Sequence, residues 1–587
     1  MSRDAYSKIG ILILALCVIT WMFVSNSWGA ESRESRIRDN RGGRLVDRDR
    51  DGYPSTVDCN DRNASVYPGT TEIPDDGIDQ DCNGVDLVTT GGGSTGGGST
   101  GGGTPATGHA NLTWDGTPGV CLSCHKEQAR EMYASTHYQW EGNALYRTNG
   151  PVKQGKISNA VNSYCINILG NWGDCGACHV GLGAQPVATA TPTDEQLKNI
   201  DCLVCHQKDY KRVKVNGIFT PDAANMAITL NKAVQTVHLP ERANCLSCHA
   251  KAGGGDAVKR GDLALASANT NDVQYDRHMS VAGADMKCQE CHITKDHRIA
   301  GRGSDLRQTD LDVEMSCTNC HTNKTTTSGH GTEDINRHVA RVACQTCHIP
   351  TYAKNASDSA ADEATETHRT WLSSNATAVP YHPASTKANN LTPKYRFWNL
   401  YSYNYVLGEA AQIDPKTGAY PTSRPDGAVD DTSPDNKLYP FKYKTAEQPM
   451  RDKTKELIAL DTNVYFRSTD TQNRATLAVK AGLKNMGYSD TDAFSWVKTD
   501  TFQLLNHQVS PPSQALACAA CHGSTTRMNL KADLGYSLKA TETALCSQCH
   551  GSKKNPGFKS VHDKHVKDKQ YDCARCHSFT RPERGLR

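Results

Sequence analysis

The chain has 587 residues and a formal net charge of +2 at pH 7, from 65 basic and 63 acidic side chains. This balance excludes the basic excess on which binding to nucleic acid depends. Hydrophobic residues make up only 37% of the chain, which is modest for a large globular protein and indicates that side chains alone do not fill its core.

Residues 1–30 are expected to be a signal peptide for export or an uncleaved membrane anchor. Arg3 and Lys8 make the start of the chain positive, and an apolar run extends from Ile9 to Val24. This run of 16 residues is slightly short for a membrane-spanning helix but does not exclude one, so both interpretations stay open. In either case we expect the chain outside the cytoplasm, in the periplasm or at the surface of a Gram-negative bacterium.

Residues 44–88 form an acidic module that we expect to bind a metal ion, most simply Ca²⁺. Its carboxylates alternate ahead of turns, as in calcium loops built from oxygen ligands. The candidate ligands are Asp47, Asp49, Asp51, Asp76, Asp79 and Asp81. Cys59 and Cys82 flank the intervening segment and would form a disulfide in an oxidising compartment. A solvated acidic loop is the alternative, because no bidentate glutamate stands at the twelfth loop position.

Residues 89–108 contain the sequence GGGSTGGGSTGGGT and are expected to be a flexible linker. A chain of this composition behaves as a random coil with an end-to-end span of roughly 25 Å. The acidic module therefore does not need to pack against the rest of the protein.

Ten copies of the pattern Cys-x-x-Cys-His use 20 of the 24 cysteines. Two cysteines three positions apart can both bond to the vinyl groups of one haem, and the histidine that follows then lies under the ring to bind the iron. The motifs are Cys121/Cys124/His125, Cys175/Cys178/His179, Cys202/Cys205/His206, Cys245/Cys248/His249, Cys288/Cys291/His292, Cys317/Cys320/His321, Cys344/Cys347/His348, Cys518/Cys521/His522, Cys546/Cys549/His550 and Cys573/Cys576/His577.

Zinc knuckles or disulfides are the alternative use of such cysteine pairs. Zinc sites do not need a histidine directly after every pair, and here each pair has one, so we expect ten haem c groups. Their propionates make the loaded protein more acidic than the bare chain, which is a further argument against nucleic acid as a partner. Without haem the remaining apolar surface does not offset the chain entropy, so we expect no folded apoprotein.

The motifs are spread unevenly along the chain. Residues 109–350 hold seven motifs, residues 351–517 hold none, and residues 518–587 hold three. We expect a mostly α protein with much irregular structure, built around stacked haems, with the acidic module on its tether. The haem-free region is rich in tyrosine and tryptophan and is expected to cap haems and shape access to a site. Within it, 472–486 and 493–506 are predicted helices.

The remaining twelve of the 22 histidines are the source of second iron ligands. Iron with two histidine ligands changes little on reduction and suits electron transfer. His109, His368 and His382 lie at the linker end or in the haem-free region and are set aside. The nine candidates are His137, His238, His278, His297, His330, His338, His507, His562 and His565. Nine candidates for ten irons leave one haem short of a histidine.

Cys165 stands ten residues before the second motif and belongs to no motif itself. Together with the sequences NIDCLVCH at 199–206 and CLSCHAKAGGGDAVK at 245–259, it resembles the octaheme tetrathionate reductase family. That family is related to hydroxylamine oxidoreductase and the multihaem nitrite reductases, and the resemblance is clearest over 121–348. It implies an active haem at the motif of His179, bound by Lys259 in place of a distal histidine, with Cys165 and Asp256 beside it.

The chemistry of these residues agrees with that resemblance. A lysine ligand must be neutral, and both desolvation and the charge of the iron favour the neutral amine. Asp256 and Lys259 are three apart and would share one face of a helical turn, so the carboxylate would orient the amine or relay protons. Cys165 would contact a sulfur substrate, or would be a buried small hydrophobe. The chain departs from the family in its ten motifs rather than eight and in its acidic module, which leaves the substrate open.

Two functions follow. One is a reductase for tetrathionate, nitrite, hydroxylamine or a similar small compound at the haem that Lys259 binds, with the other haems supplying electrons. The other is an electron conduit in which every iron has two histidine ligands and the final acceptor is a metal oxide or a partner cytochrome. In both cases we expect redox proteins as partners, either cytochromes or quinol-linked donors.

Overall fold

The chain forms two compact units, Met1–Ala110 and Asn111–Arg587. The computed structural model describes 35–38, 44–47 and scattered positions from 49 to 82 in the first unit. From 108 to the C-terminus it describes every residue except 165, 303–309, 314, 323–328, 332, 415–416, 430, 432, 523–526, 551–556, 570, 572–574 and 579–587. The predicted signal segment at 1–30 therefore lies outside the described residues. So does the predicted linker at 89–108, except for Gly108 at its end.

The first unit contains a short antiparallel pair of strands, β1 (Ser35–Arg38) and β2 (Arg44–Asp47). Cys59 and Cys82 are joined, which confirms the predicted disulfide. The rings of Tyr53 and Tyr67 stack 5.2 Å apart within the same unit. The two cysteines are 23 positions apart in sequence, so the disulfide closes the segment between them into a loop.

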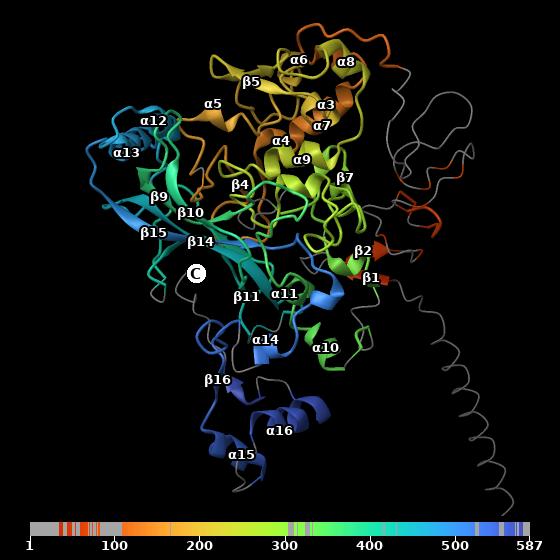
Figure 1. Cartoon of the computed structure of the whole chain (residues 1–587), viewed down its shortest axis with the longest axis vertical. Helices are drawn as coiled ribbons and strands as arrows, with labels where there is room; N and C mark the ends of the chain where they lie inside the picture. The colour runs from red at the N-terminus through yellow and green to blue at the C-terminus, as the bar shows by residue number, and fades with distance from the viewer. Residues whose placement is uncertain are drawn as a thin grey trace, which may run out of the picture. The chain divides into compact units, whose positions relative to one another are not determined.

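The motif-rich part of the second unit is built from short helices and turns (Figure 1). Its helices are α2 (Gly119–Leu122), α3 (Lys126–Ala134), α4 (Thr136–Gln139), α5 (Trp172–Cys175), α6 (Asp194–Leu197), α7 (Leu203–His206), α8 (Leu230–Gln235), α9 (Arg242–His249), α10 (Glu333–His338) and α11 (Cys344–His348), with 3-10 turns η1 (Leu265–Ala268), η2 (Cys288–Glu290) and η4 (Cys317–Asn319). Local capping explains several starts. Thr193 accepts a hydrogen bond from the amide of Gln196 at the start of α6, and Thr229 does the same for Lys232 in α8.

Short hairpins connect some of these helices. They pair β3 (Glu141–Asn143) with β4 (Lys153–Gly155), β5 (Arg212–Val215) with β6 (Ile218–Pro221), and β7 (Thr294–Lys295) with β8 (Arg298–Ile299). The density of motifs leaves no room for long elements, as expected from the sequence.

The haem-free region folds as a seven-stranded mixed sheet, so the prediction of a mostly α protein is wrong. The strands are β9 (Thr365–Ser374), β10 (Pro383–Ala388), β11 (Lys394–Trp398), β12 (Ser402–Asn404), β13 (Tyr420–Pro425), β14 (Lys437–Arg451) and β15 (Phe494–Leu504). Their order is β10-β9-β14-β15-β13-β12, with β11 also paired to β14. The pairs β14–β9 and β13–β15 are parallel and the rest are antiparallel.

The helix predicted at 493–506 is instead strand β15. It pairs with β14 along its whole length, from Phe441 opposite Leu504 to Arg451 opposite Phe494. This segment is rich in aromatic and β-branched residues, which favour a pleated surface over a helix. The helix predicted at 472–486 is confirmed as α13 (Arg474–Asn485), which packs with α12 (Thr462–Arg467) beside the sheet (Figure 1).

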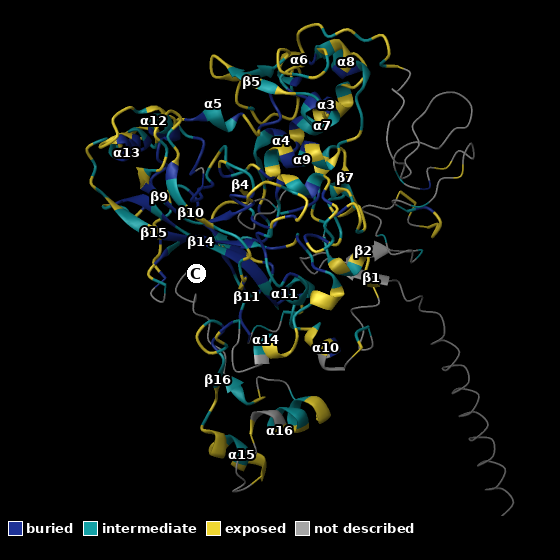
Figure 2. Cartoon of the chain, viewed as in Figure 1, coloured by how far each residue is buried: buried dark blue, intermediate teal, exposed yellow. Residues whose placement is uncertain are grey.

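The largest hydrophobic core lies between this sheet and α13. Trp371 of β9, Leu483 of α13 and the segment from Leu457 to Leu460 are all fully or almost fully buried there. Figure 2 shows the same concentration of buried residues along β14. Protein side chains therefore build a core of their own in this region, and the expected core of stacked haems describes only the motif-rich parts.

The C-terminal region contains a 3-10 turn η6 (Pro512–Gln514), α14 (Ala519–His522), β16 (Ser537–Leu538), α15 (Glu542–His550), α16 (Phe558–His562), the π-helical turn η7 (Asp563–Asp568) and β17 (His577–Ser578). Met528 and Leu534 pack against Tyr395 and Leu438, which attaches this region to the sheet. Within the described part of the chain, no helix has the length and apolar character needed to cross a membrane.

Candidate functional site

Six of the predicted distal histidines lie opposite a motif histidine. The distances between ring centres are 6.1 Å for His137 and His249, 6.4 Å for His297 and His206, 6.0 Å for His278 and His321, 6.3 Å for His507 and His292, 6.2 Å for His562 and His577, and 5.6 Å for His565 and His550. In four pairs the two histidines are at least 43 residues apart, so the fold rather than local sequence brings their rings together. In the C-terminal region the pairs of His550 with His565 and of His562 with His577 are each 15 residues apart.

These distances fit a metal ion between the rings. Two imidazoles that each bind one metal ion at about 2 Å, from opposite sides, place their ring centres about 6 Å apart. The motif cysteines lie next to each of these histidines along the chain, as covalent haem attachment requires. The residues present thus fit haem c, with six irons bound between two histidines.

The other three distal candidates lie in different surroundings. His238 is beside the third motif, where its carbonyl accepts a hydrogen bond from Nδ1 of His206 at 3.0 Å. His330 is close to His348, whose pKa is lowered by burial and also by the charge of His330. His338 is exposed at the end of α10. The structure therefore brings His238 and His330 near a motif histidine and shows His338 at the surface.

Four of the motifs share one local geometry, whereas the amide of His179 donates to the carbonyl of Gly176 at 3.1 Å. In the four, the amide of the motif histidine donates to the carbonyl of the first cysteine, at 2.9 Å in His125, 3.1 Å in His206, 2.8 Å in His292 and 2.9 Å in His321. This bond closes a single helical turn, which places the two cysteines on one side with the histidine at its end. The short helices α7, α9, α11 and α15 each end at such a histidine.

Cysteines of different motifs also meet. Cys121 lies within hydrogen-bonding reach of Cys202, Cys178 of Cys248, Cys245 of Cys288, and Cys317 of Cys344. Weaker electrostatic contacts join Cys205 to Cys248, Cys291 to Cys320, and Cys347 to Cys521. Haem attachment would convert these sulfurs to thioethers, so the contacts show which motifs, and with them which haem sites, would be neighbours in the fold. They arrange the motifs in one row, with the motif of His179 as a side branch at the motif of His249.

The last two motifs lie outside this row. Cys549 is exposed in α15, a helix without buried residues, and Cys576 is half-buried ahead of β17. Exposed cysteines also occur in the earlier motifs, at Cys124, Cys178, Cys291, Cys317 and Cys320. Cys549 and Cys576 are free thiols, which argues against the disulfide alternative, but the row described above includes neither of them. Cys573 lies outside the described residues. Haem attachment at these cysteines therefore depends on the motif spacing and on the opposing rings of His565 and His562.

His179 has a different environment from the paired histidines. Its fully buried ring packs against Tyr138, Trp140 and Trp172 at 4.9–5.4 Å between ring centres. Its Nε2 lies 2.5 Å from the carbonyl of Tyr138. Burial lowers its pKa to about 4, although the hydrogen bond with Tyr138 opposes this. The ring is therefore held neutral, as an iron ligand must be.

The residues that the family resemblance assigns to this haem come from two loops. Lys259 is buried, with only 5% of its surface exposed, and its amine lies 5.4 Å from the ring centre of Tyr164. Cys165 follows Tyr164 directly but is itself outside the described residues. Asp256 is half-buried and accepts the amide of Leu265 at 2.8 Å. The structure thus brings Lys259 beside the residue next to Cys165.

The local form of the second loop differs from the expected helical turn. Residues 251–260 form successive turns, with Gly253 and Gly254 at φ +88° and +104° and Ala257 at φ +58°. These left-handed positions are favourable for glycine and strained for alanine. Asp256 and Lys259 are therefore not related by helical geometry. Gly253 and Gly254 form a tight turn that directs the loop toward the protein interior.

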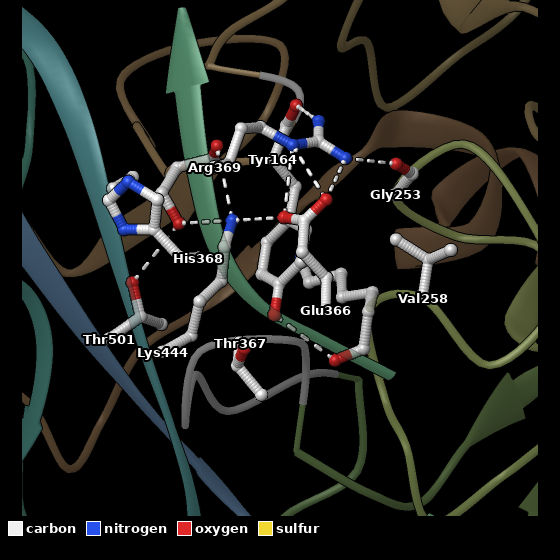
Figure 3. Close-up of polar contacts among 12 residues, drawn as sticks. Tyr164, Gly253, Val258, Glu366, Thr367, His368, Arg369, Lys444 and Thr501 are labelled. Carbon is white, nitrogen blue, oxygen red and sulfur yellow. Dashed lines mark hydrogen bonds and ion pairs between the residues drawn. The ribbon is translucent and has the colours of Figure 1, made fainter. Parts of the chain in front are cut away.

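Sheet residues complete this site, and sequence analysis missed them. Figure 3 shows Arg369 of β9 reaching Tyr164 and Gly253, with Glu366 and Lys444 close by. Lys444 of β14 pairs with Glu366 at 2.7 Å and lies 3.4 Å above the ring centre of Tyr164. The available signal was the alternation of Lys442 and Lys444 with Phe441 and Tyr443 in β14, because charges on a buried face need partners.

The electrostatics of this cluster follow from its burial. Glu366 is fully buried, and burial alone would raise its pKa, but Lys444 and Arg369 outweigh that effect and hold the pKa below its usual range. Burial lowers the pKa of Lys442 far below that of a free lysine. Lys442 still donates from Nζ to the carbonyls of Val258 at 2.9 Å and Lys259 at 2.8 Å.

The predicted metal ligands of the acidic module are mostly beyond what the structure shows. Asp51, Asp76, Asp79 and Asp81 lie outside the described residues, and only the backbone of Asp47 is described. Asp49 is half-buried. Among the described residues no cluster of three or more acidic, histidine or cysteine side chains surrounds a metal position.

Three family comparisons match parts of the chain. Residues 120–207 match the family described as "Cytochrome c554 and c-prime", and 382–525 match "Cytochrome c bacterial". Residues 58–86 match a family named for copper binding in MopE and described as "Putative metal-binding motif". The first match contains the first three motifs, and the second contains most of the sheet.

Similar whole proteins were also found. The crystal structure of octaheme cytochrome c from Shewanella oneidensis superposes with a TM-score of 0.59 and is 27% identical, covering 73% of this chain and 96% of that one. A protein of Archaeoglobus fulgidus, described as uncharacterized, is 27% identical over 234 residues, or 32% of this chain and 76% of that protein.

Proposed function

Since the chain is a multihaem cytochrome c related to the octaheme cytochrome c of Shewanella oneidensis, we propose that it carries ten haems and reduces a small oxidised sulfur or nitrogen compound at one of them. The transfer of electrons is the shared property of such cytochromes. The catalytic step belongs to the haem of Cys175, Cys178 and His179, and the other haems supply its electrons.

One observation carries this proposal: six motif histidines face another histidine, and of the other four, His125, His179, His348 and His522, it is His179 whose ring, in the described part of the chain, contacts three aromatic rings, those of Tyr138, Trp140 and Trp172. A haem without a second histidine has an iron position for another ligand or a substrate. Lys259, buried beside the loop of Cys165, is the residue with the right chemistry for that position. Haem supplies the redox chemistry when it is bound.

The residues of the chain then have separate roles. Lys259 offers a neutral amine, a ligand that can be displaced by substrate. Cys165 presents a thiol to a sulfur compound. Asp256 is half-buried nearby and supplies a proton acceptor and donor. The buried Tyr138 and the half-buried Trp140 and Trp172 around His179 limit the access of water and hold the ring in one orientation.

A second function is an electron conduit to an extracellular acceptor such as a metal oxide, with every iron bound by two histidines. The row of motifs favours it, because the contact between Cys347 and Cys521 continues the row from the motif-rich part into the C-terminal region. The last two motifs have their own opposing histidines, His565 and His562. A reductase and a conduit share this wiring and differ only at His179.

Ferric-state electron paramagnetic resonance of the loaded protein separates the two. The reductase requires one amine-ligated or high-spin iron, and that signal disappears in the variant Lys259→His together with reduction of tetrathionate and nitrite. His368→Ala is the matched control, because His368 hydrogen-bonds Thr445 in the sheet and faces no motif histidine in its ring contacts. Spectra that show only irons with two histidine ligands, or full activity in Lys259→His, would exclude the reductase and leave the electron conduit as the remaining function.

We also propose that the protein is exported and acts in the periplasm or at the cell surface, with cytochromes or quinol-linked proteins as partners. The disulfide between Cys59 and Cys82 supports an oxidising compartment. The family match at 58–86 supports metal binding by the acidic module, and its carboxylates favour a hard ion such as Ca²⁺. Metal analysis of the purified protein, before and after chelation, tests that assignment.

A further inference from the structure

We propose that Arg369 is the positioning residue of the active haem: it ties the loop that carries Cys165 to the loop that carries Lys259. We call these the thiol loop (162–166) and the amine loop (253–259). The inference rests on the proposed function, because it concerns how the two groups come to face one haem. Neither loop is near Arg369 in sequence, and the arginine lies on β9 of the haem-free sheet.

The guanidinium contacts both loops at once. One terminal nitrogen donates to the carbonyl of Tyr164, and the other donates to the carbonyl of Gly253 at 2.7 Å (Figure 3). Glu366 fixes the orientation of the group, accepting from Nε at 3.0 Å and from Nη2 at 2.8 Å. Arg369 is 93% buried, given its exposed fraction of 7%, so water does not compete for these bonds.

Neighbouring side chains hold the same loops from the sheet. Nζ of Lys442 donates to the carbonyls of Val258 and Lys259, and the hydroxyl of Tyr164 donates to the carbonyl of Lys259 at 3.3 Å. The backbone of the ligand lysine is thus held from two directions. The amine loop needs this support because Ala257 has a left-handed backbone, which relaxes readily when its surroundings do not hold it.

Only arginine suits the bridging position. Its planar group offers several donors in a fixed fork, so it satisfies a carboxylate and two carbonyls in different directions. A lysine at this position has one nitrogen on a flexible stem and reaches one loop at a time. Arg369→Lys therefore keeps the charge and loses the bridge, whereas Arg369→Gln loses both.

The experiment compares these two variants with Arg474→Gln. Arg474 is a suitable control because it is equally buried, with 5% of its surface exposed, and contacts Ser468 and Tyr381. The measurements are the ferric resonance spectrum of the loaded protein, the midpoint potential of the haem at His179, thermal unfolding, and kcat with tetrathionate or nitrite. The spectrum and the potential report the iron environment directly, and Arg474→Gln shows how much of any change follows from a general loss of stability.

We expect Arg369→Gln to shift or abolish the amine-ligated signal and to lower kcat roughly ten- to hundredfold, since misplacement by about 1 Å costs that much. Arg369→Lys is expected to fall between Arg369→Gln and the wild type, and Arg474→Gln to keep the wild-type spectrum. Should Arg369→Gln fail to accumulate, Arg369→Lys decides by the same measurements.

Two results overturn the inference. The first is a wild-type spectrum and kcat in Arg369→Gln. The second is an equal loss of stability, signal and activity in Arg369→Gln and Arg474→Gln, which means a general structural role. Absence of any amine-ligated signal in the wild-type protein contradicts the proposed function itself, and so is distinguishable from both.

Discussion

A motif histidine binds only one side of an iron, so each haem depends on a residue delivered to the other side by the fold. His137 illustrates this, because it lies in α4 and faces His249 at the end of α9. Burial lowers the pKa of both rings, which keeps them neutral and ready to bind metal. Burial thus keeps both imidazoles in the neutral form that can bind iron.

Replacing His137 with alanine is expected to leave the iron of His249 with one protein ligand. The spectrum then shows one additional high-spin ferric iron, while covalent haem content, measured by mass, stays the same because the cysteines are untouched. His368→Ala is expected to show no new signal. An unchanged spectrum for His137→Ala would mean that another residue binds this iron.

Lys354 is a second residue whose charge is set by its surroundings. Its amine donates to the carbonyls of Gln274 at 2.7 Å and Gln508 at 2.9 Å. Burial lowers its pKa to about 8, with Asp276 and Asp272 opposing the shift. Between pH 8 and about 10.4 the unfolded chain therefore holds a proton that the folded chain has released.

Stability contributed by Lys354 is accordingly expected to rise with pH through that window, by at most about 3 kcal/mol. The measurement is denaturant unfolding of the wild type and of Lys354→Met between pH 7.5 and 10.5. The free energy difference between them should move in favour of the wild type as the pH rises. A difference that is constant with pH would show that Lys354 stays charged in the folded protein.

At the residue scale, sequence was most informative where chemistry fixes the spacing. The ten motifs and the disulfide partners Cys59 and Cys82 follow from cysteine positions alone. Which histidine faces which motif did not follow, because His278 reaches His321 and not the motif that it precedes. Arg369 was not predicted either, since nothing local marks an arginine that contacts loops more than 100 residues away.

At the scale of elements, helix α13 shows how packing overrules propensity. A β-carbon at Gly482 would lie 2.5 Å from the carbonyl oxygen of Ala459, in the buried core beside the sheet. The glycine thus permits a close approach between α13 and the segment that follows β14. In an exposed helix, alanine would be better than glycine by about 1 kcal/mol.

Gly482→Ala is therefore expected to destabilise the protein, by about 1–3 kcal/mol, because the core has no space for the methyl group. Leu477→Ala on the exposed side of the same helix is the control, and its effect should be within about 0.5 kcal/mol. Thermal unfolding followed by circular dichroism measures both. Stabilisation by Gly482→Ala would show that the helix and the segment at Ala459 are farther apart than the structure has them.

The strands were the elements that sequence patterns identified least well. Strand β15 carries Phe494, Trp496 and Val497 in a spacing that also suits a helix, and its pairing with β14 decides the outcome. The partner strand begins more than 40 residues earlier, so periodicity within the segment does not reveal it. By contrast, α13 was predicted because its apolar residues repeat on one face and need no distant partner.

At the scale of the whole molecule, contacts between motif cysteines define a row. It leads from Cys121 through Cys202, Cys245, Cys288, Cys317 and Cys344 to Cys521, and Cys178 joins it at Cys248. The motif of Cys518 and Cys521 lies between the first seven motifs and the last one: Cys521 and Tyr536 pack against the same hydrophobic cluster, and the ring of Tyr536 is 4.9 Å from that of His577. Electron exchange across a missing member slows steeply with the added distance.

Removing that motif with the double variant Cys518→Ser and Cys521→Ser is expected to separate two groups of haems. The oxidised protein is mixed with less than one electron equivalent of reductant per haem, and the redistribution of electrons among the haems is followed by stopped-flow absorbance. One kinetic phase is expected in the wild type and an additional slow phase in the variant. Cys121→Ser with Cys124→Ser removes a haem at the end of the row and should keep one phase. A single phase in both variants would contradict the row.

The bridge from Arg369 to Tyr164, across 205 positions of sequence, has a consequence for biogenesis. The thiol and amine loops are synthesised well before strand β9, and domains fold as units once their chain is available. A chain truncated before β9 would keep the first seven motifs yet lack the guanidinium that joins the two loops. Completion of the pocket around Lys259 thus depends on a segment that is made after every residue that the pocket takes from the motif-rich region.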